Sequence, residues 1–81
     1  MNEEIIKKTL LRKLVYMGKW GNSHTSFDNL PKGFPTHLRG DVKDIAKKLI
    51  KEKLLLSKPT SYGLEVSLNP KKKKEVETLV D

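Results

Sequence analysis

The chain has 81 residues, a formal net charge of +7 at pH 7 and no cysteine. This length predicts one domain over residues 1–81 with a small core, and the lack of thiols excludes a disulfide framework and a thiolate metal site. No run approaches the roughly 20 apolar residues of a membrane span, so a membrane partner is not expected. The absence of cysteine fits a reducing compartment, and we expect a cytoplasmic protein.

Apolar residues at helical spacing predict the first helix over residues 3–17. Its stripe consists of Ile6, Leu10, Leu14 and Met17, widened by Leu11 and Val15. Asn2 is suited to cap the helix, and Gly18 lies where a helix commonly ends. We interpret this helix as scaffold.

Residues 18–35 are rich in Gly, Asn, Ser and Pro. Because a structureless loop of this length is unusual in a small domain, we expect two short elements here. Residues 22–25 would form a brief strand that pairs with a later hairpin. Residues 26–32 would hold one or two helical turns that begin at Ser26 or Asp28. The expected core residues of this segment are Trp20, Phe27, Leu30 and Phe34.

The next segment predicts a long amphipathic helix over residues 36–53. Its apolar side consists of Leu38, Val42, Ile45, Ala46, Leu49 and Ile50. Thr36 is the expected cap, with a later start capped by Asp41 as the alternative. Gly40 inside the pattern costs roughly 1 kcal/mol relative to Ala, which suggests a close backbone approach to the core or to a ligand.

After Lys53 the period changes from helical to alternating, which predicts a hairpin over residues 54–68. Residues 54–56 form a short apolar run, and a second strand alternates apolar and polar residues up to Leu68. Residues 57–63 contain Pro and Gly and predict an exposed, basic turn. Asn69 followed by Pro70 then begins a short last helix within residues 69–81, expected to pack on the first helix.

The positive charge is concentrated in one part of the chain. Residues 36–74 hold 11 basic and 4 acidic side chains, whereas the remainder holds six of each. A localised positive field attracts polyanions. The alternative is a lysine-rich surface that only faces water.

This order of elements resembles the winged-helix family of helix-turn-helix nucleic-acid-binding domains, and in particular small archaeal winged-helix proteins without assigned function. The resemblance rests on HTSFDNLPKGFPTHLRG (24–40) and KPTSYGLEVSLNP (58–70). It implies an α+β winged-helix domain with three to four helices and a C-terminal β-hairpin wing. The helix before the turn departs from the family pattern, because it is short and contains Pro31.

The resemblance places the helix over 36–53 in the major groove of duplex DNA and the hairpin over 54–68 as the wing. Arg39 would donate hydrogen bonds to guanine, while lysines would contact phosphates and Gly40 would let the backbone approach the duplex. The expected contacts of the helix are Arg39, Gly40, Lys43, Lys47 and Lys48. The alternative is a helix side that only faces water.

The hairpin tip supplies the second group of expected contacts, namely Lys58, Thr60, Ser61 and Tyr62. Lysine and hydroxyl groups suit phosphate oxygens. Tyr62 could instead stack on an unpaired base, which would favour RNA. The alternative is that these residues only shape a turn.

A catalytic role is not expected. His24 lies among hydroxyl residues, but the sequence offers no cysteine nucleophile, no acid placed to orient the histidine and no glycine-rich phosphate loop. His24 and His37 with Asp28 and Asp41 lack a metal-binding spacing, so no metal or cofactor is expected.

We therefore expect a nucleic-acid-binding protein with a transcriptional or chromosomal role, with duplex DNA favoured over RNA. The alternatives are a protein-interaction module that docks on an acidic partner and an RNA-binding domain that acts through the wing.

Overall fold

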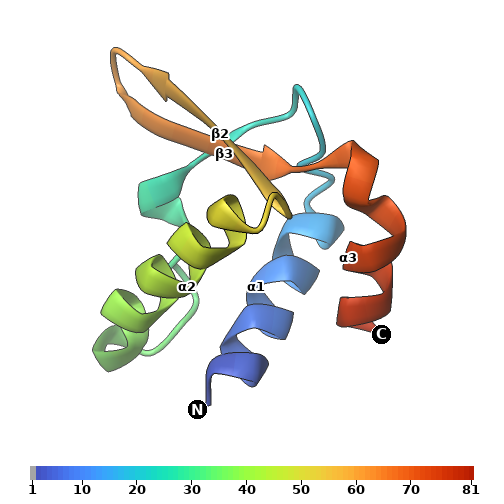
Figure 1. Cartoon of the computed structure of the whole chain (residues 1–81). Helices are drawn as coiled ribbons and strands as arrows, with labels where there is room; N and C mark the ends of the chain where they lie inside the picture. Colours follow the sequence, from blue (N-terminus) through green and yellow to red (C-terminus); the bar gives the residue numbers. More distant parts are fainter. Residues whose placement is uncertain (1) are drawn as a thin grey trace.

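The computed structural model describes residues 2–81 as an α+β domain with three α-helices and a three-stranded antiparallel sheet (Figure 1). The helices are α1 (Glu3–Tyr16), α2 (Arg39–Lys51) and α3 (Lys73–Val80). The strands β1 (Thr25–Ser26), β2 (Leu55–Thr60) and β3 (Gly63–Leu68) lie in the order β1-β3-β2. Single 3-10 turns form η1 (Phe27–Asn29), η2 (Thr36–Leu38) and η3 (Pro70–Lys72).

Helix α1 follows the predicted pattern. The Asn2 side chain accepts a hydrogen bond from the Ile5 N–H (2.9 Å), which confirms the expected cap. The helix ends before Gly18, whose φ of +66° suits glycine. The placement of Met17 on the buried stripe was wrong, because the helix ends at Tyr16 and Met17 is 43% exposed.

The segment between α1 and α2 contains both expected short elements. The strand lies at Thr25–Ser26 rather than over residues 22–25, and it pairs with β3 as expected. Ser26 accepts a hydrogen bond from the Asp28 N–H and starts the 3-10 turn η1. Phe27, Leu30 and Phe34 are buried, which confirms them as core residues, whereas Trp20 is only partly buried.

Helix α2 is shorter than the predicted 36–53. Residues 36–38 form the 3-10 turn η2 without a side-chain cap, so the roles expected for Thr36 and Asp41 as caps were wrong. The helix ends at Lys51 because Lys53 has a φ of +67°, a left-handed conformation that cannot continue an α-helix. Leu38 is nevertheless buried with the rest of the apolar side.

The strands of the hairpin are longer than predicted and its turn is tighter. Residues 57–60 belong to β2, so only Ser61 and Tyr62 connect the strands, in place of the expected turn over 57–63. The Asn69 N–H donates to the Leu54 carbonyl (3.1 Å), so residues 54 and 69 form a hydrogen-bonded pair. Such pairs then recur at every second position of the ladder between β2 and β3. Pro59 falls between these pairs on an edge strand, so its missing N–H removes no ladder hydrogen bond.

The C-terminal helix packs on α1, as the sequence predicts (Figure 1). Asn69 accepts a hydrogen bond from the Lys71 N–H (3.0 Å) and donates one to the Lys53 carbonyl (2.8 Å). Arg12 and Lys8 of α1 donate to carbonyls at the end of the chain, at 2.7 and 2.9 Å. Asn69 therefore both caps the last helical segment and ties it to the end of α2.

One hydrophobic core joins the three helices to the two long strands, with fully buried members that include Leu10, Val42, Val66, Leu68 and Val76. The apolar sides of α1 and α2 and one face of the sheet meet there. Among residues 2–81, none of the helices has the length and apolar composition that a membrane crossing requires.

Candidate nucleic-acid interface

Helix α2 turns its apolar side to the core and leaves the opposite side open. Val42, Ala46 and Leu49 are at most 1% exposed, which fixes the rotation of the helix about its axis. Because side chains recur every 3.6 residues, this rotation directs Gly40, Lys47 and Lys51 outward, while Asp44 lies toward α1 and lines a hollow with Glu3 and Lys48. We call this surface the outward side of α2. All three residues are exposed, and we group Arg39 with them because it is exposed at the start of the helix, although its position about the helix axis is closer to Ala46.

The cations on the outward side have no acidic partner within residues 2–81. Arg39, Lys47 and Lys51 make no ion pair there. Lys51 was not among the expected contacts. It continues the spacing of four residues from Arg39 through Lys47, so the signal for it was present in the sequence.

Lys43 lies at one edge of this side and is half-buried. Its Nζ is 3.5 Å from the Asp28 carboxylate, so it joins α2 to η1. A phosphate contact by Lys43 would therefore compete with Asp28 or share the ammonium with it.

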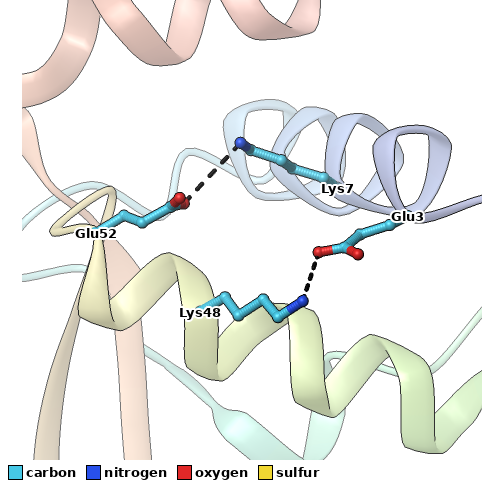
Figure 2. Close-up of polar contacts among 4 residues, drawn as sticks. All are labelled: Glu3, Lys7, Lys48 and Glu52. Carbon is cyan, nitrogen blue, oxygen red and sulfur yellow. Dashed lines mark hydrogen bonds and ion pairs between the residues drawn. The ribbon is translucent and has the colours of Figure 1, made fainter.

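Lys48 lies at the other edge of α2 and faces α1 (Figure 2). Its Nζ donates a 2.8 Å hydrogen bond to Glu3, and this hydrogen bond and charge raise the pKa of Lys48. A second pair, between Lys7 and Glu52 at 3.9 Å, joins the same two helices. The structure thus separates Lys48 from Arg39 and Lys47, which the sequence placed in one group of contacts.

Nothing within the described residues requires a glycine at position 40. Its φ is not positive, and a Cβ built at this position meets no atom within 4 Å. Gly40 is therefore not explained by packing against the core, which was one of the two reasons considered for it.

The hairpin tip projects beyond the helices (Figure 1). Tyr62 is 98% exposed, and Lys58 and Ser61 are also exposed. Thr60 differs, because its hydroxyl donates to the Gly63 carbonyl (2.8 Å) and accepts from the Tyr62 N–H (3.2 Å). This hydroxyl closes the turn and is not available for a phosphate contact without disturbing it.

In Figure 1 the first turn of α2 lies at the bottom of the molecule and the hairpin tip at the top, so the two groups of expected contacts are at opposite ends of this view. The structure leaves Gly40, Lys47 and, at the start of the helix, Arg39 exposed on α2, and it places Tyr62 at the end of a separate projection. Lys43 and Lys48 occupy the two edges of α2, each beside a carboxylate.

The histidines and nearby acids form no cluster. Over residues 2–81, no three His, Asp or Glu side chains converge in a geometry that could hold a metal ion. His24 lies just before β1, whereas His37 lies in η2 at the start of the long helical segment.

Comparison of the chain with models of protein families, with curated proteins and with solved structures found no match.

Proposed function

We propose that the chain is a winged-helix domain that binds duplex DNA, with α2 in the major groove and the β2–β3 hairpin as the wing. Binding, rather than catalysis, is the proposed activity, in a transcriptional or chromosomal role. The single observation that carries the proposal is the outward side of α2, where Arg39, Lys47 and Lys51 have no acidic partner among residues 2–81.

The order of the elements supports this assignment. A helix, a short strand, a turn, a second helix and a hairpin follow one another, and β1 pairs with the second strand of the hairpin. The weak point of the resemblance was the helix before the turn, and here a single 3-10 turn occupies that position. The buried side chains of Val42, Ala46 and Leu49 hold α2 on the core, so α2 has a defined position without a full preceding helix. The exposed ion pair between Lys43 and Asp28 adds a weak link from this turn to α2.

The charges on α2 suggest separate roles for its residues. Arg39 lies in the first turn, and its planar guanidinium can donate two hydrogen bonds to one guanine edge. Lys47 and Lys51 are flexible point charges that suit phosphate oxygens. Gly40 lies next to Arg39 and exposes bare backbone, which would allow the duplex to approach α2 closely.

The edges of α2 and the hairpin would add weaker phosphate contacts. Lys43 and Lys48 each contact a carboxylate, so a phosphate gains less from them than from Lys47. On the hairpin, Lys58 and the exposed tip would follow the backbone beside the groove, as wings of the family do.

The test is fluorescence anisotropy of labelled random duplex DNA and of single-stranded RNA, titrated with the protein from low to physiological salt. We expect duplex binding with a steep fall of log affinity against log salt and a dissociation constant of micromolar or below near 150 mM. Non-specific binding alone gives about 10⁻⁴–10⁻⁶ M at physiological salt. Binding that passes this test would justify selection of a preferred site from random sequences.

Two outcomes would overturn the proposal. A preference for single-stranded RNA that Tyr62→Ala abolishes would assign the function to the wing. Absence of binding to either nucleic acid at physiological salt would mean that the outward side of α2 only faces water or contacts a protein.

A second candidate, docking of a protein strand, rests on the open edge of the sheet. In the hydrogen-bond pattern of the hairpin, the backbone groups of Leu55 and Ser57 point away from β3, and β2 is an edge strand. An acidic partner could add a strand there beside Lys58. If so, amide exchange at Ser57 would slow when the partner binds, and Ser57→Pro would abolish the complex while leaving duplex binding intact.

A further inference from the structure

An open hollow of about 690 Å³ lies away from the outward side of α2, between the loop after α1 and strand β2. Its walls come from the loop at residues 21–24, from β2 at residues 56–58 and from residues 69–71 at the start of the last helical segment. A smaller hollow of about 210 Å³, lined by Trp20, Pro70 and Lys73, adjoins it at Pro70. We call the two together the Pro70 groove.

The Pro70 groove has a fixed wall. The Gly21 N–H donates to the Leu68 carbonyl (2.9 Å), and the Leu68 N–H donates to the Lys19 carbonyl (2.7 Å), which ties the loop to the end of β3. Gly21 has a φ of +57°, and a Cβ there would lie 3.2 Å from Pro70. A side chain at position 21 would therefore crowd the Pro70 ring and adopt a strained backbone conformation.

The chemistry of the groove combines cations with flat rings. Lys58 and Lys71 line the larger hollow, and Lys73 lines the smaller one. Within residues 2–81 none of these three forms an ion pair, although Glu65 lies opposite Lys58 in the strand register and offsets part of its charge. His24 and Trp20, both only partly buried, lie in separate hollows of the same groove.

The sheet surface beneath the larger hollow offers apolar contact. Leu56 lines the hollow and is 38% exposed, which is high for a leucine in a strand. Its register partner Ser67 projects to the same face, is fully buried and has a hydroxyl without a hydrogen-bond partner in the described chain. Apolar contact, aromatic rings and spaced cations together suit a chain of phosphates that carries exposed bases.

We propose that the Pro70 groove binds single-stranded nucleic acid, at a site separate from the duplex-binding side of α2. One base would stack on Trp20, and phosphates would lie against Lys71 and Lys73 while Lys58 attracts the strand further along. A strand fits better than a free nucleotide because the cations are spread over two hollows. This proposal does not depend on the function proposed for α2.

The intrinsic fluorescence of the protein offers a local test, because Trp20 is the only tryptophan in the chain. We would titrate the protein with a thymine oligonucleotide of about 10 nucleotides, within the range that one single-strand-binding domain covers. We expect saturable quenching of the Trp20 emission and an affinity that falls as salt rises. A matching titration with thymidine monophosphate should give at least tenfold weaker binding.

Variants separate this groove from the other surfaces. Lys71→Glu with Lys73→Glu should weaken oligonucleotide binding at least tenfold, while Lys47→Glu on the outward side of α2 should change it less than twofold. All substituted positions are exposed, and circular dichroism would verify that the variants fold. For duplex DNA we expect the reverse order, in which Lys47→Glu weakens binding more than the double variant does. Failure of one proposal can then be distinguished from failure of the other.

Four results would overturn the proposal. The first is absence of quenching at low salt, and the second is equal quenching of the double variant and the unmodified protein. The third is loss of oligonucleotide binding in Tyr62→Ala, which would assign the strand to the hairpin tip. Equal affinity for the monophosphate and the oligonucleotide would make the site a nucleotide pocket and would reject the strand.

Discussion

The outward side of α2 and the seam between α1 and α2 are built from the same kinds of residues, yet their charges are arranged differently. Lys47 and Lys48 are neighbours in the chain. Lys47 extends outward without an acidic partner in the described chain, whereas Lys48 turns to α1 and donates a hydrogen bond to Glu3 (Figure 2). Lys7 and Glu52 form a second pair across the seam.

The difference shows that net charge alone does not define a binding surface. Seam lysines meet carboxylates 45 residues away in the chain, so part of the positive charge of α2 is balanced before any ligand arrives. On the outward side, Arg39, Lys47 and Lys51 make no ion pair within the described residues, and Asp44 lies toward the seam. A polyanion would therefore gain most on the outward side.

The largest effect that would sharpen this comparison is expected at Arg39. Arg39→Ala should cost about 1–3 kcal/mol at a preferred DNA site and relax the sequence preference, because a bidentate contact to guanine is lost. Anisotropy against the preferred duplex and a set of single-base variants would measure it. Lys47→Ala is the control, since loss of a phosphate contact should weaken all sequences equally. Uniform weakening by both substitutions would contradict base readout by Arg39.

The second effect compares the two neighbouring lysines directly. Lys47→Ala should lower the slope of log affinity against log salt by about one unit, because one phosphate contact is lost. Lys48→Ala should lower it by clearly less, since Glu3 already occupies that ammonium. Salt titrations of both variants on one random duplex would measure the slopes. Equal slopes would break the distinction between the outward side and the seam.

The third effect, at Gly40, should have opposite signs in stability and binding. Gly40→Ala should raise the free energy of unfolding by less than about 1 kcal/mol, because Ala favours the helix and the added Cβ meets no neighbour, but Gly40 is only the second residue of α2. Duplex binding should weaken, because the Cβ would keep the DNA away from the backbone. Urea denaturation and anisotropy would measure the two quantities. A more stable variant with unchanged binding would remove Gly40 from the interface.

The smallest effect is expected from Glu3→Gln in the seam. The unfolding midpoint should move little, because both partners of the Glu3–Lys48 pair are largely exposed. Duplex binding should tighten slightly, because Lys48 is released. Combining Glu3→Gln with Lys48→Ala tests this, since Lys48→Ala should cost more affinity in the Glu3→Gln background than in the unmodified protein. If the effects of the two substitutions on affinity were additive, Lys48 would not contact the duplex.

Local signals in the sequence were sufficient where neighbouring residues decide the structure. The caps at Asn2 and Asn69 are confirmed because each acts on an N–H two or three residues away. The apolar stripes correctly placed the cores of α1 and α2, since helical periodicity is a property of the segment itself. The alternation before Leu68 likewise indicated β3.

Pairing with distant segments determined the extent of β2 and the end of α2, which local signals in the sequence did not predict. Residues 57–60 looked like a turn because they are polar and contain Pro59, but pairing with β3 holds them in an edge strand. The end of α2 was placed too late because the left-handed Lys53 looks like any lysine in the sequence. Its carbonyl accepts a hydrogen bond from Asn69, 16 residues later.

The sequence alone thus determined an α+β chain with its helices, its hairpin and a positive charge confined to residues 36–74. Only the tertiary structure decided which of those charges are balanced, and it assigned Lys48 to the seam and Lys47 to the outward side. It also brought Trp20, Pro70 and Lys73 to one groove. The physical reason is that periodicity and capping act over a few residues, whereas ion pairs and grooves depend on segments that meet only when the core forms.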